Sequence, residues 1–264
     1  MAILECLSEA PKGATISELV TRLDVEKSIV SRIVATLEGD GYVVRTGQGD
    51  SFSIALRFAA ITLRHIDQLG ISEFCLPLLR ELVDKTGELI QLAITENGRM
   101  VYVAQAEGKQ RIRLLSLIGR SVVLHASTAG KVWLASLPED AALATVLKQG
   151  FKPQTAKTIR TLDQLRAELT RVRKHGYATV SEELIEGAAA VGVPVWNTRG
   201  DRVLGAIVLS SPVYRLSKKR TIELVPMLKE AAAKLTQLGN IDTYFGSMIT
   251  DEPRLLPEVK RKLA

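Results

Sequence analysis

The segment from His125 to Lys131 reads His-Ala-Ser-Thr-Ala-Gly-Lys and combines a histidine, two hydroxyls, a glycine and a lysine. A Walker A phosphate loop would need glycine in place of His125 and serine or threonine in place of Val132, so that interpretation fails at both positions. Ser127 lacks the GxSxG elbow of a serine hydrolase and has no obvious histidine–acid relay nearby. Small residues at a helix start leave backbone N–H groups free and present the positive end of the helix dipole. The segment therefore suits a small anion, and it equally suits a tight helix start packed on a sheet.

Other residue types that often do chemistry do not form a site. His65, His125 and His175 are far apart and show no HxH or HExxH spacing, and the two cysteines match no disulfide or ligand-pair pattern. We therefore predict no metal, no cofactor and no catalytic residue. Glu182 and Glu183 form an acidic pair that we interpret as a solvated turn, because adjacent carboxylates on a strand or turn point in different directions. The basic run from 148 to 174 is interpreted as a solvated helix surface.

A second candidate site lies near the start of the third helix, which is predicted from about Glu26 to Glu38. We expect its apolar residues to face inward, and these are Ile29, Val30, Ile33, Val34 and Leu37. The opposite face would carry Lys27, Ser28, Ser31 and Arg32. The first residues of a recognition helix contact base edges in the major groove, and Arg32 is the best candidate for a bidentate contact with guanine. Arg45 is expected either to contact a phosphate or the minor groove, or simply to flank a strand.

The elements around this helix predict a winged helix-turn-helix over residues 1–54. A first short helix is followed by Thr15-x-x-Glu18, a capping box that opens a second helix. After the third helix, short strands at 42–45 and 51–54 surround a glycine-rich turn and form the wing. Residues 55–70 are expected to form a linker helix.

Residues 71–240 predict a second domain. The domain should begin with a helix at 72–85 and strands near 89–95, 100–104 and 111–115. Helices near 128–136, 139–148 and 162–175 should follow. Strands at 177–180, 190–196 and 203–209 and a last helix from 217 to 238 should complete it. Tight turns between successive strands favour a mainly antiparallel sheet flanked by helices, so the fold class is α+β. Pro226 should kink the last helix or delay its start. The tail, 241–264, is polar and loosely patterned.

Composition agrees with two soluble domains. The chain has 264 residues, of which 46% are apolar and 24% charged, and no apolar stretch reaches the ~20 residues that cross a bilayer. We therefore expect a cytoplasmic protein with no membrane partner. The net charge of +6 is unevenly placed, because residues 1–66 carry seven Lys/Arg and eight Asp/Glu, a net −1. DNA binding by this region would rest on a few placed cations and would depend only weakly on salt.

Several motifs in order resemble the IclR family of bacterial transcription factors over residues 1 to about 240. They are the third helix (26–37) with Gly41-Tyr42, the segment 124–131 with Leu134-Ala135, Arg173-Lys-His-Gly-Tyr-Ala178 with Glu182-Glu183, Gly192-Val-Pro-Val195, and Ser210-Ser-Pro-Val-Tyr-Arg215.

The resemblance implies a winged-helix domain that binds double-stranded operator DNA, a linker helix that helps dimerisation, and an effector domain similar to the GAF fold. It implies a regulator, such as a repressor, that is not an enzyme and that acts as a homodimer or homotetramer. A small carboxylate effector would meet backbone N–H groups at Val122, Thr128 and Ala129. Side chains around it would be Leu114, Val180, Ala190, Val208 and Ser210.

Three of these positions depart from the family members that respond to glyoxylate and pyruvate. Val180, Ala190 and Val208 stand where polar or ionisable residues are usual in those members. Apolar walls favour an apolar ligand body at ~25 cal/mol per Å² of buried surface. We therefore expect a larger, more hydrophobic effector, such as an aromatic acid.

The alternative is a GAF-like sensor or enzyme that acts on a small metabolite without binding DNA. A sulfoxide reductase of that type would need a pair of reactive cysteines in the pocket, and Cys6 and Cys75 are predicted in separate helices.

Overall fold

The computed structural model describes residues 1–46, 50–68, 70–108, 110 and 117–237. The chain divides into two compact units, residues 1–68 and 69–264, each with its own hydrophobic core. The predicted tail, 241–264, and the predicted strand at 111–115 lie outside the described residues.

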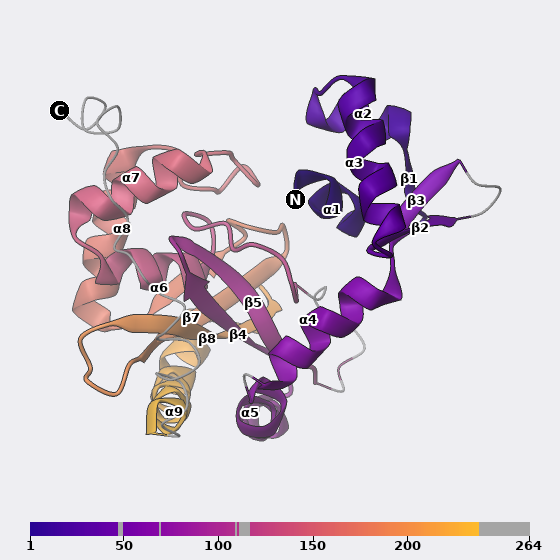
Figure 1. Cartoon of the computed structure of the whole chain (residues 1–264). Coiled ribbons are helices and arrows are strands. Elements are labelled where there is room, and N and C mark those ends of the chain that lie inside the picture. The colour runs from indigo at the N-terminus through magenta and orange to yellow at the C-terminus, as the bar shows by residue number, and fades with distance from the viewer. Residues whose placement is uncertain (47–49, 69, 109, 111–116, 238–264) are drawn as a thin grey trace. The chain divides into compact units, whose positions relative to one another are not determined.

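The described part of residues 1–54, within the first unit, contains three helices and a small sheet (Figure 1). The helices are α1 (Ala2–Ser8), α2 (Ile16–Leu23) and α3 (Lys27–Gly39), and the strands are β1 (Ala14–Thr15), β2 (Val43–Thr46) and β3 (Ser51–Ile54) in the order β1-β3-β2. The predicted capping box is confirmed, since the Thr15 hydroxyl accepts from the Glu18 amide and the Glu18 carboxylate accepts from the Thr15 amide. The helix-turn-helix prediction is therefore confirmed, and the two-residue strand β1 is an addition to it.

The expectation for the buried face of α3 was partly wrong. Val30 and Val34 are buried, whereas Ile29 and Ile33 are 37% and 41% exposed. Helical periodicity marks a broad apolar arc, and the small core of this unit covers only one side of that arc. The exposed isoleucines lie on the same stretch of helix as Arg32.

Helix α4 (Leu56–Gln68) follows the wing, where the linker helix was predicted. None of its side chains is buried, and its apolar residues Leu56, Ile61, Leu63 and Ile66 are all exposed. Several exposed apolar side chains on one short helix are typical of a surface that contacts another protein surface.

The second unit is built on a five-stranded sheet in the order β5-β4-β8-β7-β6, and every neighbouring pair is antiparallel. The strands are β4 (Leu89–Glu96), β5 (Arg99–Ala106), β6 (Ala178–Ser181), β7 (Ala188–Trp196) and β8 (Val203–Pro212). The turn between β4 and β5 contains Asn97 and Gly98, both with positive φ, as tight hairpins require. The prediction of a mainly antiparallel sheet is confirmed.

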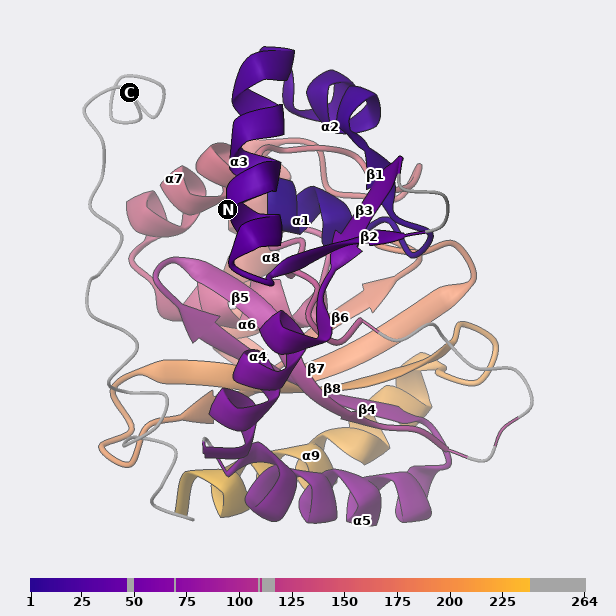
Figure 2. The ribbon, with the colours of Figure 1, turned by 45° about the vertical axis from the view of Figure 1, so that its right-hand side comes forward.

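Helices cover both faces of this sheet (Figure 2). One face carries α5 (Leu76–Thr86) and α9 (Lys218–Gln237), and the other carries α6 (Thr128–Ser136), with α7 (Glu139–Gln149) and α8 (Leu162–His175) packed against α6. The helix predicted at 72–85 begins later, because Ile71–Cys75 form a π-helical turn. Pro226 does not delay the start of α9. The carbonyl that Pro226 leaves without a donor belongs to the exposed Ile222, where water can replace it.

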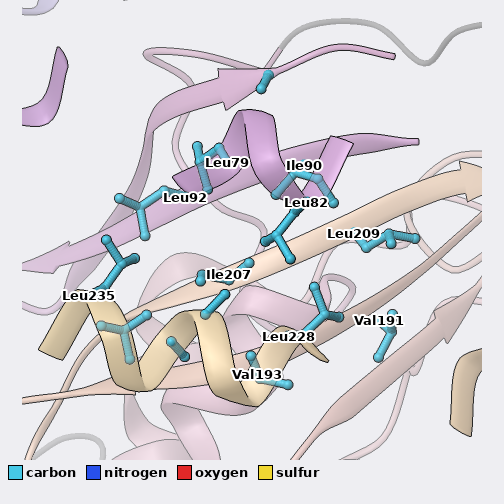
Figure 3. Close-up of a cluster of buried hydrophobic side chains, with 14 of the residues drawn as sticks. Leu79, Leu82, Ile90, Leu92, Val191, Val193, Ile207, Leu209, Leu228 and Leu235 are labelled. Carbon is cyan, nitrogen blue, oxygen red and sulfur yellow. The ribbon is translucent and has the colours of Figure 1, made fainter. Parts of the chain in front are cut away.

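The face under α5 and α9 is packed with aliphatic side chains (Figure 3). Leu79 and Leu82 from α5 and Leu228 and Leu235 from α9 meet the strand residues Ile90, Leu92, Val191, Val193, Ile207 and Leu209. These packing contacts hold the strands in place, so the residues on the opposite face of the sheet can form a binding site.

Candidate functional site

A pocket that is partly open to solvent lies on the α6 side of the sheet. Its lining comes from all five strands of the sheet, the start of α6, the residue Leu117 and the β6–β7 loop. The lining residues are Leu89, Gln91, Tyr102, Leu117, Ser127, Thr128, Val180, Leu184, Ile185, Ala188, Ala189, Ala190, Val208 and Ser210. None of these side chains is charged. A ligand that carries a charge would have to be satisfied by neutral donors.

The strand register arranges the floor of the pocket in rows. Leu89, Ser210, Ala190 and Val180 stand opposite one another across β4, β8, β7 and β6. The next row contains Gln91, Val208 and Gly192. Residues in register point to the same face of a sheet, so residues distant in sequence form one surface.

The start of α6 stands over this floor. The Ser127 side chain caps the helix by accepting from the Gly130 amide. The amides of Thr128 and Ala129 have no acceptor among the described residues, as expected for the first positions of a helix. Thr128 is 1% exposed, and its hydroxyl has no partner in the described part of the chain. A Cβ on Gly192 would lie 2.9 Å from the Thr128 Cβ, so glycine is what lets α6 come this close.

Five of the eight predicted effector residues line this pocket: Thr128, Val180, Ala190, Val208 and Ser210. Val122 and Ala129 are buried beside it, and Leu114 lies outside the described residues. The Val122 amide donates to the Met100 carbonyl at 2.7 Å, so this N–H is already engaged within the protein. The predicted set therefore gathers around one cavity, with two free amides rather than three.

The β6–β7 loop is held against α6 by a buried ion pair. Lys131 is 1% exposed, and its Nζ donates to both Glu183 oxygens at 2.8 and 2.7 Å. The Thr158 hydroxyl donates to the Glu183 carbonyl, and Lys157 pairs with Glu182. The interpretation of Glu182 and Glu183 as a solvated turn was wrong for Glu183, because the buried Lys131, 52 positions earlier in the sequence, pairs with it. The loop brings Leu184 and Ile185 into the pocket lining, which sequence reasoning missed.

Glu168 and Arg171 of α8 extend this ion pair. Glu168 lies 3.3 Å from Lys131 and accepts two hydrogen bonds from Arg171. Burial raises the pKa of Glu183. Burial also acts on Glu168, but the Arg171 hydrogen bonds and the Lys131 charge outweigh it and lower the pKa of that carboxyl. The interpretation of the 148–174 run as a solvated surface was therefore wrong at Glu168 and Arg171.

Two further polar groups are buried on this side. Burial raises the pKa of Tyr102 to about 12. His125 stacks on Phe151 and approaches the Lys152 carbonyl through Nε2, while burial lowers its pKa. Both groups are neutral at pH 7, and only Tyr102 lines the pocket.

On α3, the predicted DNA-contacting residues occupy one accessible stretch. Lys27, Ser28 and Arg32 are exposed and Ser31 is half-buried. Arg45 is engaged within the unit: its guanidinium pairs with Glu38 at 2.7 Å and lies over the Phe52 ring. This contact ties the strand β2 to the end of α3.

The cysteines do not meet at the pocket. Cys75 is buried on the α5/α9 side, where burial raises its thiol pKa to about 11, and Cys6 belongs to the first unit. No three His, Cys, Asp or Glu side chains in the described ranges are grouped so as to hold a metal ion.

Two family descriptions match the chain. "IclR helix-turn-helix domain" covers residues 1–47, and "Bacterial transcriptional regulator IclR C-terminal" covers residues 63–237. The chain belongs to the IclR family. It is a DNA-binding transcriptional regulator with a C-terminal effector-binding domain.

Individual relatives of this IclR regulator span nearly its whole length. It is 31% identical to the HTH-type transcriptional regulator KdgR of Escherichia coli over 92% of both chains. A solved IclR regulator from Alicyclobacillus acidocaldarius is similar with a TM-score of 0.77 and 25% identity, over 90% of this chain and 95% of that one.

A third relative was solved as its inducer-binding domain. The inducer-binding domain of a PobR double mutant from Acinetobacter, solved with 3-hydroxybenzoic acid, has a TM-score of 0.57 and 26% identity. The match covers 61% of this chain and 95% of that one. In the IclR regulator described here, no helix among the described residues is both long and apolar enough to span a membrane.

Proposed function

We propose that this IclR regulator binds a small carboxylate with an apolar body in the pocket beside α6, and that this binding controls its affinity for operator DNA. The observation that carries the proposal is the pair of free amides at Thr128 and Ala129, beside a buried and unpartnered Thr128 hydroxyl. These donors and the positive end of the helix dipole suit a carboxylate.

The rest of the lining supports an apolar ligand body. Leu89, Leu117, Val180, Leu184 and Val208 offer hydrocarbon surface, and no charged side chain competes for the ligand. A very small polar acid would leave these walls uncovered, whereas a ring would bury them at ~25 cal/mol per Å². The PobR domain solved with 3-hydroxybenzoic acid is a relative that holds an aromatic acid.

Isothermal titration of the full chain with benzoate and with glyoxylate tests this proposal. Benzoate is expected to bind at least tenfold more tightly, because each buried CH₂-sized group contributes about 0.8 kcal/mol. Tighter binding of glyoxylate would overturn the aromatic-acid proposal.

We propose that α3 reads DNA through Lys27, Ser28, Ser31 and Arg32, with Arg32 contacting guanine. The exposed Ile29 and Ile33 add apolar surface to the same helix, which is the chemistry that contacts a thymine methyl. Arg45 already pairs with Glu38, so we assign it the role of holding the wing rather than a base contact.

A gel-shift assay on operator and random DNA tests the role of α3. Arg32→Ala should weaken operator binding about 5- to 150-fold, equivalent to about 1–3 kcal/mol for one bidentate contact, and should weaken random DNA less. Arg80→Ala, which removes an exposed helix arginine in the second unit, is the control. Unchanged binding by Arg32→Ala would show that α3 does not read the operator.

We propose that the regulator acts as a homodimer or larger homo-oligomer. The apolar side chains Leu56, Ile61, Leu63 and Ile66 of α4 are exposed, which fits a helix that meets a second copy. Dimeric readers contact half-sites about one helical turn, ~34 Å, or a multiple of it apart. Because binding linkage is reciprocal, saturating operator must change the affinity for the acid by the same factor as the acid changes operator affinity.

A further inference from the structure

The pocket contains a second buried polar group that the carboxylate site does not use. Gln91 of β4 lines the pocket and is 1% exposed, and its Nε2 has no hydrogen-bond partner among the described residues. Buried amide groups are paired in nearly all proteins, so a group like this indicates a missing partner.

Ser210 contacts the oxygen end of this amide. Its hydroxyl donates to the Gln91 Oε1 at 3.3 Å, which leaves Nε2 as the free end. Because Ser210 also lines the pocket, the pair forms a small polar patch in an otherwise apolar wall. The free N–H group of Gln91 could donate a hydrogen bond to an acceptor atom of a ligand in the pocket.

The sheet register places this donor at the opposite end of the pocket floor from the free amides. Gln91 stands opposite Val208, Val208 stands opposite Gly192, and Thr128 packs against Gly192. Two strand spacings separate Gln91 from Gly192, a span of about 10 Å. A ligand whose carboxylate meets α6 therefore lies with its body over Val208 and its far end toward Gln91.

We propose that Gln91 is a specificity-determining residue for the effector. It donates a hydrogen bond to an oxygen at the end of the molecule remote from the carboxylate. The effector class is thus an acid with an apolar body and a distal hydroxyl or carbonyl oxygen. This inference rests on the proposed carboxylate site, and it adds a requirement for a second polar group.

Competition with water should make the pocket prefer acids that carry a distal oxygen. In the absence of ligand, a water molecule inside the pocket can satisfy Nε2. A ligand with a distal oxygen replaces that water bond, whereas a plain aromatic acid displaces the water and leaves the amide unpaired. The hydroxylated acid should therefore bind about tenfold more tightly than its parent.

Titration calorimetry on the full-length protein tests this inference, with benzoate, 3-hydroxybenzoate and 4-hydroxybenzoate as probes. The wild type should prefer one of the hydroxybenzoates over benzoate by about tenfold. Gln91→Leu should lose this preference and bind benzoate more tightly than the wild type does, because no amide is left unpaired. Gln105→Leu is the matched control, because Gln105 is the register partner of Gln91 on β5, does not line the pocket and should keep the preference.

The outcomes separate the two proposals. If benzoate binds and the hydroxybenzoates gain nothing, or if Gln91→Leu keeps the wild-type ratio, Gln91 does not set specificity and the carboxylate site stands. If none of the three acids binds the wild type, the proposed function fails together with this inference. Gln91→Met, which keeps the side-chain length, repeats the comparison if thermal unfolding shows that Gln91→Leu is poorly folded.

Discussion

The two faces of the five-stranded sheet differ sharply although the same strands supply both. The face under α5 and α9 is an aliphatic core. The face under α6 contains the pocket, the Lys131 ion pair and the unpartnered atoms of Gln91, His125 and Thr128. Both faces therefore carry buried apolar side chains, whereas the polar groups lie on the α6 face.

Strand alternation produces this difference. On β4, Ile90 and Leu92 enter the aliphatic core while Gln91 enters the pocket; on β8, Leu209 enters the core while Val208 and Ser210 line the pocket. Successive side chains of a strand point to opposite faces. Residues on the pocket face can therefore change with the ligand while the packing that fixes the strands is kept.

The largest effect is expected from breaking the buried ion pair on the pocket side. Lys131→Met should lower the free energy of unfolding by about 3–5 kcal/mol, because it leaves Glu183 buried without its cation. Lys157→Met is the matched control: it removes an exposed lysine that pairs with the neighbouring Glu182, and should cost no more than about 1 kcal/mol. Urea unfolding measures both. Equal losses would mean that the buried pair does not secure the loop.

A cavity on the aliphatic face should cost nearly as much without touching the ligand. Leu228 is fully buried in α9, so Leu228→Ala should lower the free energy of unfolding by about 2–5 kcal/mol. The affinity for the acid, measured by calorimetry below the unfolding transition, should be unchanged. A parallel loss of affinity would show that the two faces are not independent.

A methyl group added at Gly192, between the sheet and α6, should reduce the stability of the pocket side by a smaller amount. Gly192→Ala places a Cβ 2.9 Å from Thr128, and the resulting displacement of α6 should cost about 1–3 kcal/mol of stability and weaken acid binding. Gly39→Ala on α3, which meets nothing within 4 Å, should be neutral or stabilising by up to about 1 kcal/mol. Full retention of acid affinity in Gly192→Ala would argue against the carboxylate site at the start of α6.

The smallest expected effect is a pH dependence that Tyr102 adds on the pocket side. The pKa of this phenol is raised to about 12 in the folded protein, against about 10 in the unfolded chain. Its stabilising contribution is complete below pH 10 and is lost as pH rises toward 12, because only the unfolded state ionises in that window. At pH 11 the loss is about 1.4 kcal/mol. Urea unfolding at pH 9 and pH 11 should show this extra loss in the wild type and not in Tyr102→Phe.

Local signals predicted much of the fold. The capping box at Thr15, the start of α6 at Thr128 and the bounds of α8 follow from short-range patterns, and all three are confirmed. Periodicity could not show that Ile29 and Ile33 are exposed, because burial depends on how far the rest of the domain extends over a helix.

The pocket was predicted less completely, since it is formed by contacts between distant segments. Family motifs pointed to Thr128, Val180, Ala190, Val208 and Ser210, which the sheet register brings together. Nothing local connects Lys131 with Glu183, or identifies Leu184, Ile185 and Gln91 as lining residues. Alternation on β4 marks Gln91 as facing away from Ile90, and a polar residue within that apolar strand was the available signal.

A crystal structure of the full chain with the tightest-binding hydroxybenzoate tests the central claim most directly. We predict the carboxylate within hydrogen-bond distance of the Thr128 and Ala129 amides, the ring over Val208 and the hydroxyl oxygen at Gln91 Nε2. An acid bound on the α5/α9 side of the sheet, or outside this pocket altogether, would contradict the account.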